Sequence, residues 1–187
     1  MKKYIFLAIA ALTLLPSCKE QKENNVIIAP KQAENKPAGT IVMQDLNSSN
    51  EVQWMGKTYR ILVERKADKS LPQPEPEPGR KAYDNSISLR IVRPDGSTFF
   101  NKTFKKQDFT SYLDEKTIRS GVLLGVVLDR AEGDNLIFAV SVGSPDALSD
   151  EFIPMILTVN RMGNISIKRD NTMDTAATPG DEEDDGV

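Results

Sequence analysis

The sequence predicts an all-β domain in which consecutive antiparallel hairpins form a β-sandwich. Short apolar, β-branched runs recur along the chain, and turn residues such as Pro94-Asp95-Gly96-Ser97 separate one run from the next. Strands at about 8 to 12-residue spacing with turns between them are typical of sandwiches and small barrels. A sandwich is expected, and a small lipocalin-like barrel is the alternative.

Four hairpins are expected, each with a glycine at or beside its turn, where a positive φ is often required. Two apolar faces are needed to bury six large side chains together: Trp54, Phe100, Phe104, Leu124, Phe138 and Ile156. The expected strand pairs are residues 51–55 with 57–65, 87–92 with 98–104, 121–129 with 136–142, and 153–161 with 164–168.

One stretch is predicted to be helical, over residues 107–116. Phe109, Tyr112 and Leu113 fall at helical spacing, and Asp108 is placed to cap the first turn.

The amino-terminal residues predict export and a lipid anchor. Lys2 and Lys3 precede an apolar run, residues 5–15, that is shorter than the roughly 20 residues needed to span a bilayer. Leu15-Pro16-Ser17-Cys18 resembles the lipobox of bacterial lipoproteins, in which the cysteine takes a diacylglycerol and becomes the acylated first residue. Several acyl chains suffice for stable anchoring, so Cys18 is the expected lipidation site and the membrane an expected partner.

The chain is therefore divided into four parts. Residues 1–17 are the expected signal peptide, 18–38 a flexible polar tether, 39–172 a single β-domain, and 173–187 an acidic disordered tail without basic residues.

Composition excludes much familiar chemistry. The chain has no histidine and one cysteine, so the common zinc, haem and iron–sulfur ligand sets and Ser-His or Cys-His catalysis are absent. Its formal net charge is −3 and becomes more negative once Lys2 and Lys3 are removed, so nucleic acid is not an expected partner. No metal, no cofactor and no catalytic residue is predicted.

Several segments also resemble an uncharacterised domain-of-unknown-function family of Bacteroides-type lipoproteins. The resemblance implies a Gram-negative envelope protein, on the periplasmic or the outward-facing side of the outer membrane, and assigns no activity. The segments are Trp54-Met55-Gly56-Lys57-Thr58-Tyr59, Asp84-Asn85, residues 94–100, Glu132-Gly133, residues 150–154 and the lipobox.

Candidate ligand contacts are the polar-tipped rings of Trp54, Tyr59 and Tyr83, although such residues also fill cores. The alternation Pro72 to Pro78 favours a polyproline helix, which serves either as a docking segment or as a stiff loop. Thr175, in Asp174-Thr175-Ala176, resembles a Bacteroides-type O-glycosylation site.

The expected function is that of an envelope-anchored, non-catalytic binding or accessory module with a glycan or protein partner. The alternatives are a hydrolase inhibitor, or a hydrolase of envelope or dietary polymer that works through acids alone. The adjacent pairs Asp114-Glu115 and Asp150-Glu151 are the nearest approach to paired acids, but neighbouring residues do not share a face of a strand or helix.

Overall fold

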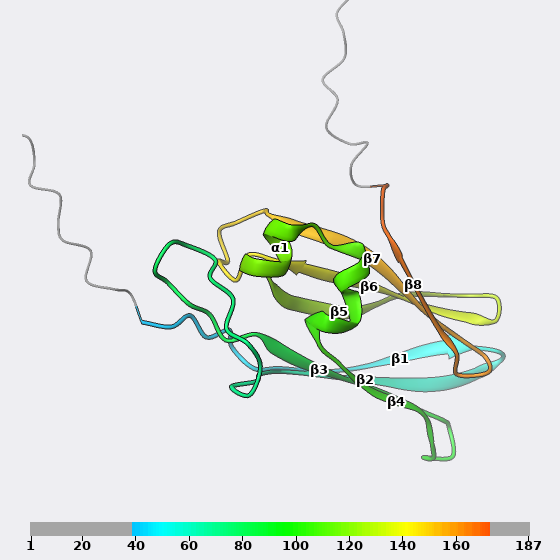
Figure 1. The fold of residues 1–187 in the computed structure, drawn as a ribbon. Helices are drawn as coiled ribbons and strands as arrows, with labels where there is room; N and C mark the ends of the chain where they lie inside the picture. Colours follow the sequence, from blue (N-terminus) through cyan, green and yellow to red (C-terminus); the bar gives the residue numbers. More distant parts are fainter. Residues whose placement is uncertain (1–38, 173–187) are drawn as a thin grey trace, which may run out of the picture. The chain divides into compact units, whose positions relative to one another are not determined.

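The computed structural model describes residues 39–172, which form two four-stranded antiparallel sheets packed together (Figure 1). Each sheet is a meander, with the order β1-β2-β3-β4 in one and β5-β6-β7-β8 in the other. The first sheet contains β1 (Leu46–Trp54), β2 (Lys57–Ala67), β3 (Asn85–Val92) and β4 (Thr98–Phe104). The second contains β5 (Val122–Glu132), β6 (Asn135–Gly143), β7 (Phe152–Asn160) and β8 (Ile165–Arg169).

The sandwich prediction is confirmed, and so are all four hairpins. Each expected strand pair is present, and the four pairs are β1–β2, β3–β4, β5–β6 and β7–β8. No strand of one sheet pairs with a strand of the other in the described part of the chain, so the barrel alternative is wrong. The predicted signal peptide, tether and acidic tail lie outside the described residues.

The first hairpin has a two-residue turn. Met55 and Gly56 form it with φ angles of 50° and 71°, and Trp54 pairs with Lys57 directly across it. Two positive φ values are typical of a type I′ turn, whose twist matches that of the flanking strands. The register of β1 against β2 is therefore fixed from this turn onward.

Side chains of both sheets meet in one core. Of the six large residues expected there, Trp54, Phe104 and Phe138 are buried. They share the core with apolar residues that alternate along the strands, including Ile87, Leu89 and Ile91 of β3. This alternation leaves the other residues of each strand on the outer face.

The other three of those six residues are only partly buried. The placement of Leu124 and Ile156 in the core was wrong, whereas Phe100 does pack against it. Met155 and Leu157 take the inner face of β7, which leaves Ile156 between them on the outer face. Leu124 lies at a register irregularity of β5, and Phe100 packs against the core from β4 at the sheet edge.

The predicted single helix is divided into two shorter ones. A 3-10 helix, η1 (Lys106–Tyr112), precedes α1 (Glu115–Ser120), and Leu113 and Asp114 between them are extended. Asp114 caps α1 by accepting a hydrogen bond of 2.7 Å from the backbone N–H of Thr117. Asp108, in the first turn of η1, accepts from the backbone N–H of Lys105, the residue before that helix, and so takes part in its cap. Within residues 39–172, no helix is long and apolar enough to cross a bilayer.

Gly143, the last residue of β6, is predicted to tolerate no side chain. A Cβ there would overlap the carbonyl oxygen of Glu151 and the Cα of Phe152. Gly143→Ala should therefore lower the free energy of unfolding by about 1–3 kcal/mol, measured by denaturant titration. In the control Gly125→Ala, the new Cβ would meet Ser141 Oγ at an ordinary 3.8 Å. Equal losses in the two variants would contradict this packing.

Candidate functional site

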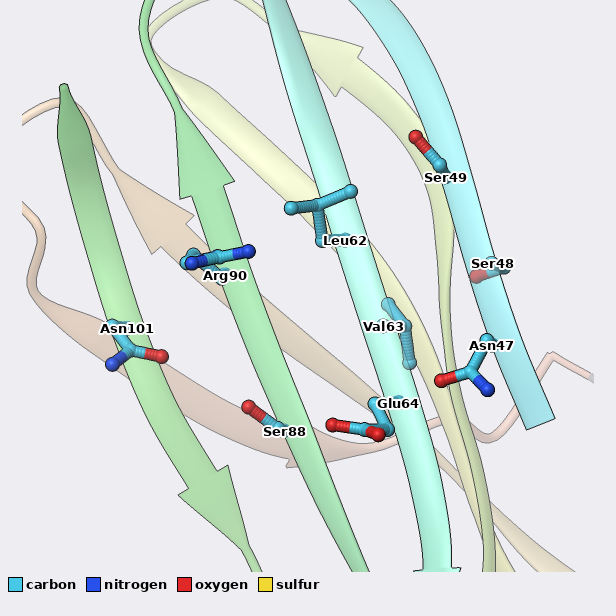
Figure 2. Close-up of a pocket in the computed structure, with 9 residues that line it drawn as sticks. All are labelled: Asn47, Ser48, Ser49, Leu62, Val63, Glu64, Ser88, Arg90 and Asn101. Atoms are coloured by element: carbon cyan, nitrogen blue, oxygen red, sulfur yellow. The ribbon is translucent and has the colours of Figure 1, made fainter. Parts of the chain in front are cut away.

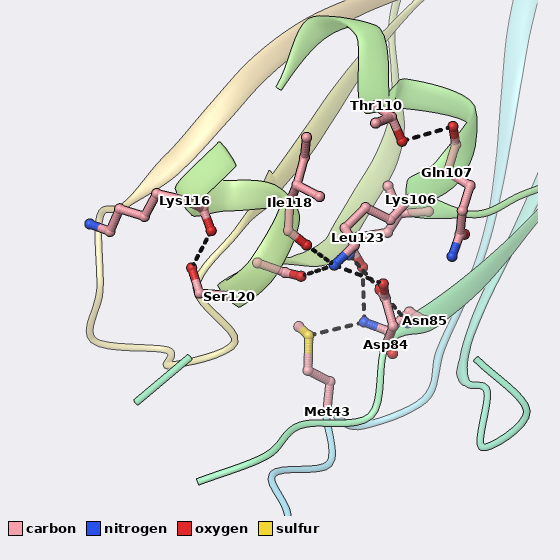
Figure 3. A network of polar contacts seen from close by, with 11 residues as sticks. Met43, Asp84, Asn85, Lys106, Gln107, Thr110, Lys116, Ile118, Ser120 and Leu123 are labelled. Carbon is pink, nitrogen blue, oxygen red and sulfur yellow. Dashed lines mark hydrogen bonds and ion pairs between the residues drawn. The ribbon is translucent and has the colours of Figure 1, made fainter. Parts of the chain in front are cut away.

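The most deeply buried ionisable group is the carboxylate of Asp84, which is 1% exposed (Figure 3). Its Oδ1 accepts hydrogen bonds of 2.8 Å from the backbone N–H groups of Asn85 and Leu123. Its Oδ2 lies 3.5 Å from Nζ of Lys106, whose ammonium also donates to the carbonyl oxygens of Ile118 and Gly121. Buried charges of this kind are usual only when they are paired and hydrogen-bonded.

The cluster joins parts of the chain that are distant in sequence. Asp84 and Asn85 stand at the start of β3, while Leu123 stands at the start of β5. Asn85 Nδ2 adds a bond of 2.8 Å to the carbonyl oxygen of Leu123. Apart from the ion pair and the contact of Asn85 with Met43, the partners are main-chain groups. The cluster therefore connects the two sheets, and we assign it a structural role.

A hollow of about 570 Å³ lies on the outer face of the β1–β4 sheet, and we call it the outer-face hollow (Figure 2). The strand registers place its side chains in two cross-strand rows. One row runs through Ser49, Leu62, Arg90 and Asn101, and the other through Asn47, Glu64 and Ser88. Ser48 and Val63 complete the lining.

The outer-face hollow is polar and mostly uncharged. Hydroxyl and amide groups from Asn47, Ser49, Ser88 and Asn101 supply both donors and acceptors. Its one carboxylate, Glu64, is paired with Lys66 at 2.5 Å. The side chain of Arg90 has no ion pair or hydrogen bond to any residue between 39 and 172. The surface can thus hydrogen-bond a polar ligand, and Arg90 remains available to it.

Two of the predicted ligand-contact rings lie in the core. Trp54 is 2% exposed and Tyr59 6% exposed, and their ring centroids are 5.0 Å apart in an edge-to-face arrangement. Phe99 packs against both rings. The edge of Tyr59 still reaches a second hollow, of about 390 Å³, beside Arg93 and Pro94. The buried indole offers no exposed stacking surface.

Tyr83 is not brought together with the other two rings. It precedes β3, near the residues that pair with the end of β2, whereas Tyr59 lies near the start of β2. Its half-exposed ring is covered by the ammonium of Lys69, at 5.7 Å from the centroid. The three aromatic candidates therefore do not form one binding surface.

One carboxylate from each of the two adjacent acidic pairs lines the same hollow, which sequence reasoning missed. Asp114 and Glu151 both line a hollow of about 330 Å³ beside α1. Hydrogen bonds from the backbone N–H and the hydroxyl of Thr117 lower the pKa of Asp114, and Glu151 is paired with Lys116 at 2.9 Å. A general acid of a glycosidase needs a raised pKa, so Asp114 is poorly suited to that role.

The proline-rich segment is bonded to the rest of the domain. Pro74 is buried and its carbonyl oxygen accepts from the backbone N–H of Ala82 at 2.9 Å. The backbone N–H of Glu75 donates to the backbone carbonyl oxygen of Arg119 at 3.2 Å. The segment is thus part of the connection between β2 and β3.

The last points to compare with the sequence analysis are metal ligands and the two modification sites. Among residues 39–172, no group of three or more His, Cys, Asp or Glu side chains lies close enough together to hold a metal ion. Cys18 and Thr175 lie outside the described residues.

Comparison with known proteins identifies a family but no activity. The model of the family DUF4738, described as a domain of unknown function, matches residues 27–167 of the chain. No curated protein matches the sequence of this chain.

The buried pair of Asp84 and Lys106 gives a test of the structural role. Lys106→Met should lower the free energy of unfolding by about 3 kcal/mol or more, because it leaves the Asp84 charge buried and unpaired. The control is Lys116→Met, which breaks an ion pair whose side chains are 69% exposed and should cost less than about 1 kcal/mol. Denaturant titration measures both. Similar losses in the two variants would contradict a role for Lys106 in joining the sheets.

Proposed function

We propose a function for this chain from the premise that it belongs to DUF4738, a family described as a domain of unknown function. The proposed function is that of a non-catalytic module that binds a glycan on the outer face of the β1–β4 sheet. A lipid on Cys18 would hold this module at the envelope of a Bacteroides-type bacterium.

The outer-face hollow is the observation that carries the binding role. It crosses all four strands of one sheet, and its rim is built from hydroxyl, amide and guanidinium groups. Such groups match the hydroxyls of a glycan, and the exposed side chain atoms of Leu62 add a small apolar contact. A rigid sheet also keeps these groups in place before the ligand arrives, which lowers the entropic cost of binding.

The carboxylates favour binding over acid catalysis. The outer-face hollow contains one carboxylate, Glu64, whereas glycosidases generally use two. In the hollow beside α1, Asp114 is engaged as a helix cap and Glu151 in an ion pair. We therefore rank the acid-only hydrolase below the binding module. A hydrolase inhibitor would need a protein partner. The binding test below distinguishes such an inhibitor from a glycan-binding module.

The proposed lipid anchor is supported by the amino-acid sequence alone. Leu15-Pro16-Ser17-Cys18 matches a lipobox after an apolar segment too short to span a bilayer. Residues 19–38 would then connect the lipid to the β-domain, on whichever face of the outer membrane the protein resides.

Ser88→Tyr should block the outer-face hollow. Ser88 is a half-buried residue on the outer face of β3, so a tyrosine ring would fill the space that a ligand needs. We expect the full chain to bind at least one polysaccharide in a panel of neutral and acidic glycans and peptidoglycan fragments. The substitution should weaken that binding at least tenfold, measured by isothermal titration calorimetry.

Ser141→Tyr is the matched control for this test. Ser141 is half-buried on the outer face of β6, an inner strand of the other sheet, and its substitution should leave binding unchanged. Binding that survives Ser88→Tyr would exclude this surface, and a wild-type chain that binds none of the glycans would overturn the glycan-binding role. Tight binding to a purified hydrolase, with loss of its activity, would favour the inhibitor instead.

Cys18→Ser should release the protein from the membrane. A serine cannot form the thioether with diacylglycerol, so radiolabelled palmitate should enter the wild-type chain and not the variant. Fractionation should move the variant from the membrane pellet to the soluble fraction. Ser17→Ala keeps a small residue before the cysteine and should retain the label. A labelled Cys18→Ser variant would refute anchoring at this residue.

A further inference from the structure

The four edge strands of the two sheets differ in how they are protected against pairing with another chain. β1 and β4 are the edges of one sheet, and β5 and β8 those of the other. A strand edge presents unpaired N–H and C=O groups, and proteins discourage its pairing with bulges, charges, prolines or short strands.

Three of these edges carry such features. β8 has only five residues and ends in Lys168 and Arg169. β5 has two register irregularities. β4 places Lys102 opposite the buried Leu89, so a charge stands on the inner face of that edge. Each feature makes the addition of a further strand unfavourable.

β1 has no bulge, no proline and no charge on its inner face. All nine of its residues pair with β2 in one uninterrupted register, from Leu46 opposite Arg65 to Trp54 opposite Lys57. The strand contains no lysine, arginine or proline, and most of its residues are exposed. It is thus a long, uninterrupted edge whose single charge, Glu51, lies on the outer face.

The turn determines which backbone groups of β1 are unpaired. In a two-residue type I′ hairpin, the residues that flank the turn exchange hydrogen bonds, and every second residue does so thereafter. Trp54 and the residues at even positions therefore bond to β2, while Asn47, Ser49, Glu51 and Gln53 direct their N–H and C=O groups away from it. No backbone bond from these four residues to a loop or turn is present between residues 39 and 172.

We propose that β1 pairs with β1 of a second copy of this chain, antiparallel, about a two-fold axis at Asn50. Asn50 then lies opposite Asn50 of the other copy. On either side of it, Ser49 faces Glu51 and Asn47 faces Gln53. All four residues with outward backbone groups find partners in this register, which is the self-complementarity that a two-fold interface requires.

The side chains are compatible with this pairing. Glu51, the single charged residue of β1, faces Ser49, so no like charges are opposed across the axis. On the other face, Val52 lies opposite Ser48. The two-fold axis at Asn50 therefore opposes polar or apolar side chains and brings no pair of like charges directly together.

The dimer would also enlarge the surface proposed for binding. Asn47 and Ser49 stand at the β1 side of the outer-face hollow, which is where the second copy would join. The outer faces of the two β1–β4 sheets would become continuous, and the two hollows would lie on either side of the axis. This pairing rests on the strand edge and holds independently of any ligand.

Disulfide crosslinking tests the register directly. In a Cys18→Ser background, Asn50→Cys provides the only thiol of the chain. Opposed residues at a non-hydrogen-bonded position are about 4.5 Å apart between Cα atoms, which lies within the range of disulfides. Mild oxidation should give a covalent dimer with Asn50→Cys. Glu51→Cys, whose opposite residue is Ser49, should give at least tenfold less.

Sedimentation velocity provides the second measurement. The full-length Cys18→Ser chain should be a dimer, and Ser49→Pro should make it a monomer because proline removes one of the outward N–H groups. Ser49→Ala should remain a dimer, and circular dichroism should show all variants folded. A monomeric parent chain, or equal crosslinking of Asn50→Cys and Glu51→Cys, would overturn the proposal.

Discussion

The two sheets are connected by core packing and by a few side-chain hydrogen bonds, among them those of the buried Asp84 carboxylate. Asp84 accepts backbone hydrogen bonds at the start of β3 and at the start of β5, and its charge is balanced by Lys106. Since no strand pairing joins the sheets within residues 39–172, these directional bonds define where one sheet begins relative to the other. Apolar packing alone is non-directional and would specify this offset less strictly.

The two outer faces of the domain differ in chemistry. The β1–β4 sheet presents hydroxyl, amide and charged groups around the outer-face hollow. The central row of the other sheet presents Val127, Ala139 and Ile156, and Val127 is 55% exposed. The centre of the second face thus offers a hydroxyl-rich ligand fewer hydrogen-bonding groups than the outer-face hollow does. This difference is the reason for assigning binding to one face of the sandwich.

Sequence reasoning succeeded where the signal was local. The hairpins follow from alternating polarity and turn glycines, both readable within about twenty residues. The division of the helix at Leu113 was missed, although the Asp114 cap is a local signal for a second helix; Leu113 itself packs against the core. The Asp84 bond to Leu123 joins residues 39 positions apart. The outer-face hollow needs the register of four strands, from Asn47 to Asn101, which alternation alone does not supply.

Each sheet is built from one continuous stretch of chain, residues 46–104 and 122–169. Sequential hairpins keep most strand contacts short in sequence, which favours fast folding for a β protein. The first four strands can complete their hydrogen bonds before the last four have been synthesised or exported. The folding chain would then expose unpaired strands only briefly, which lowers its risk of aggregation.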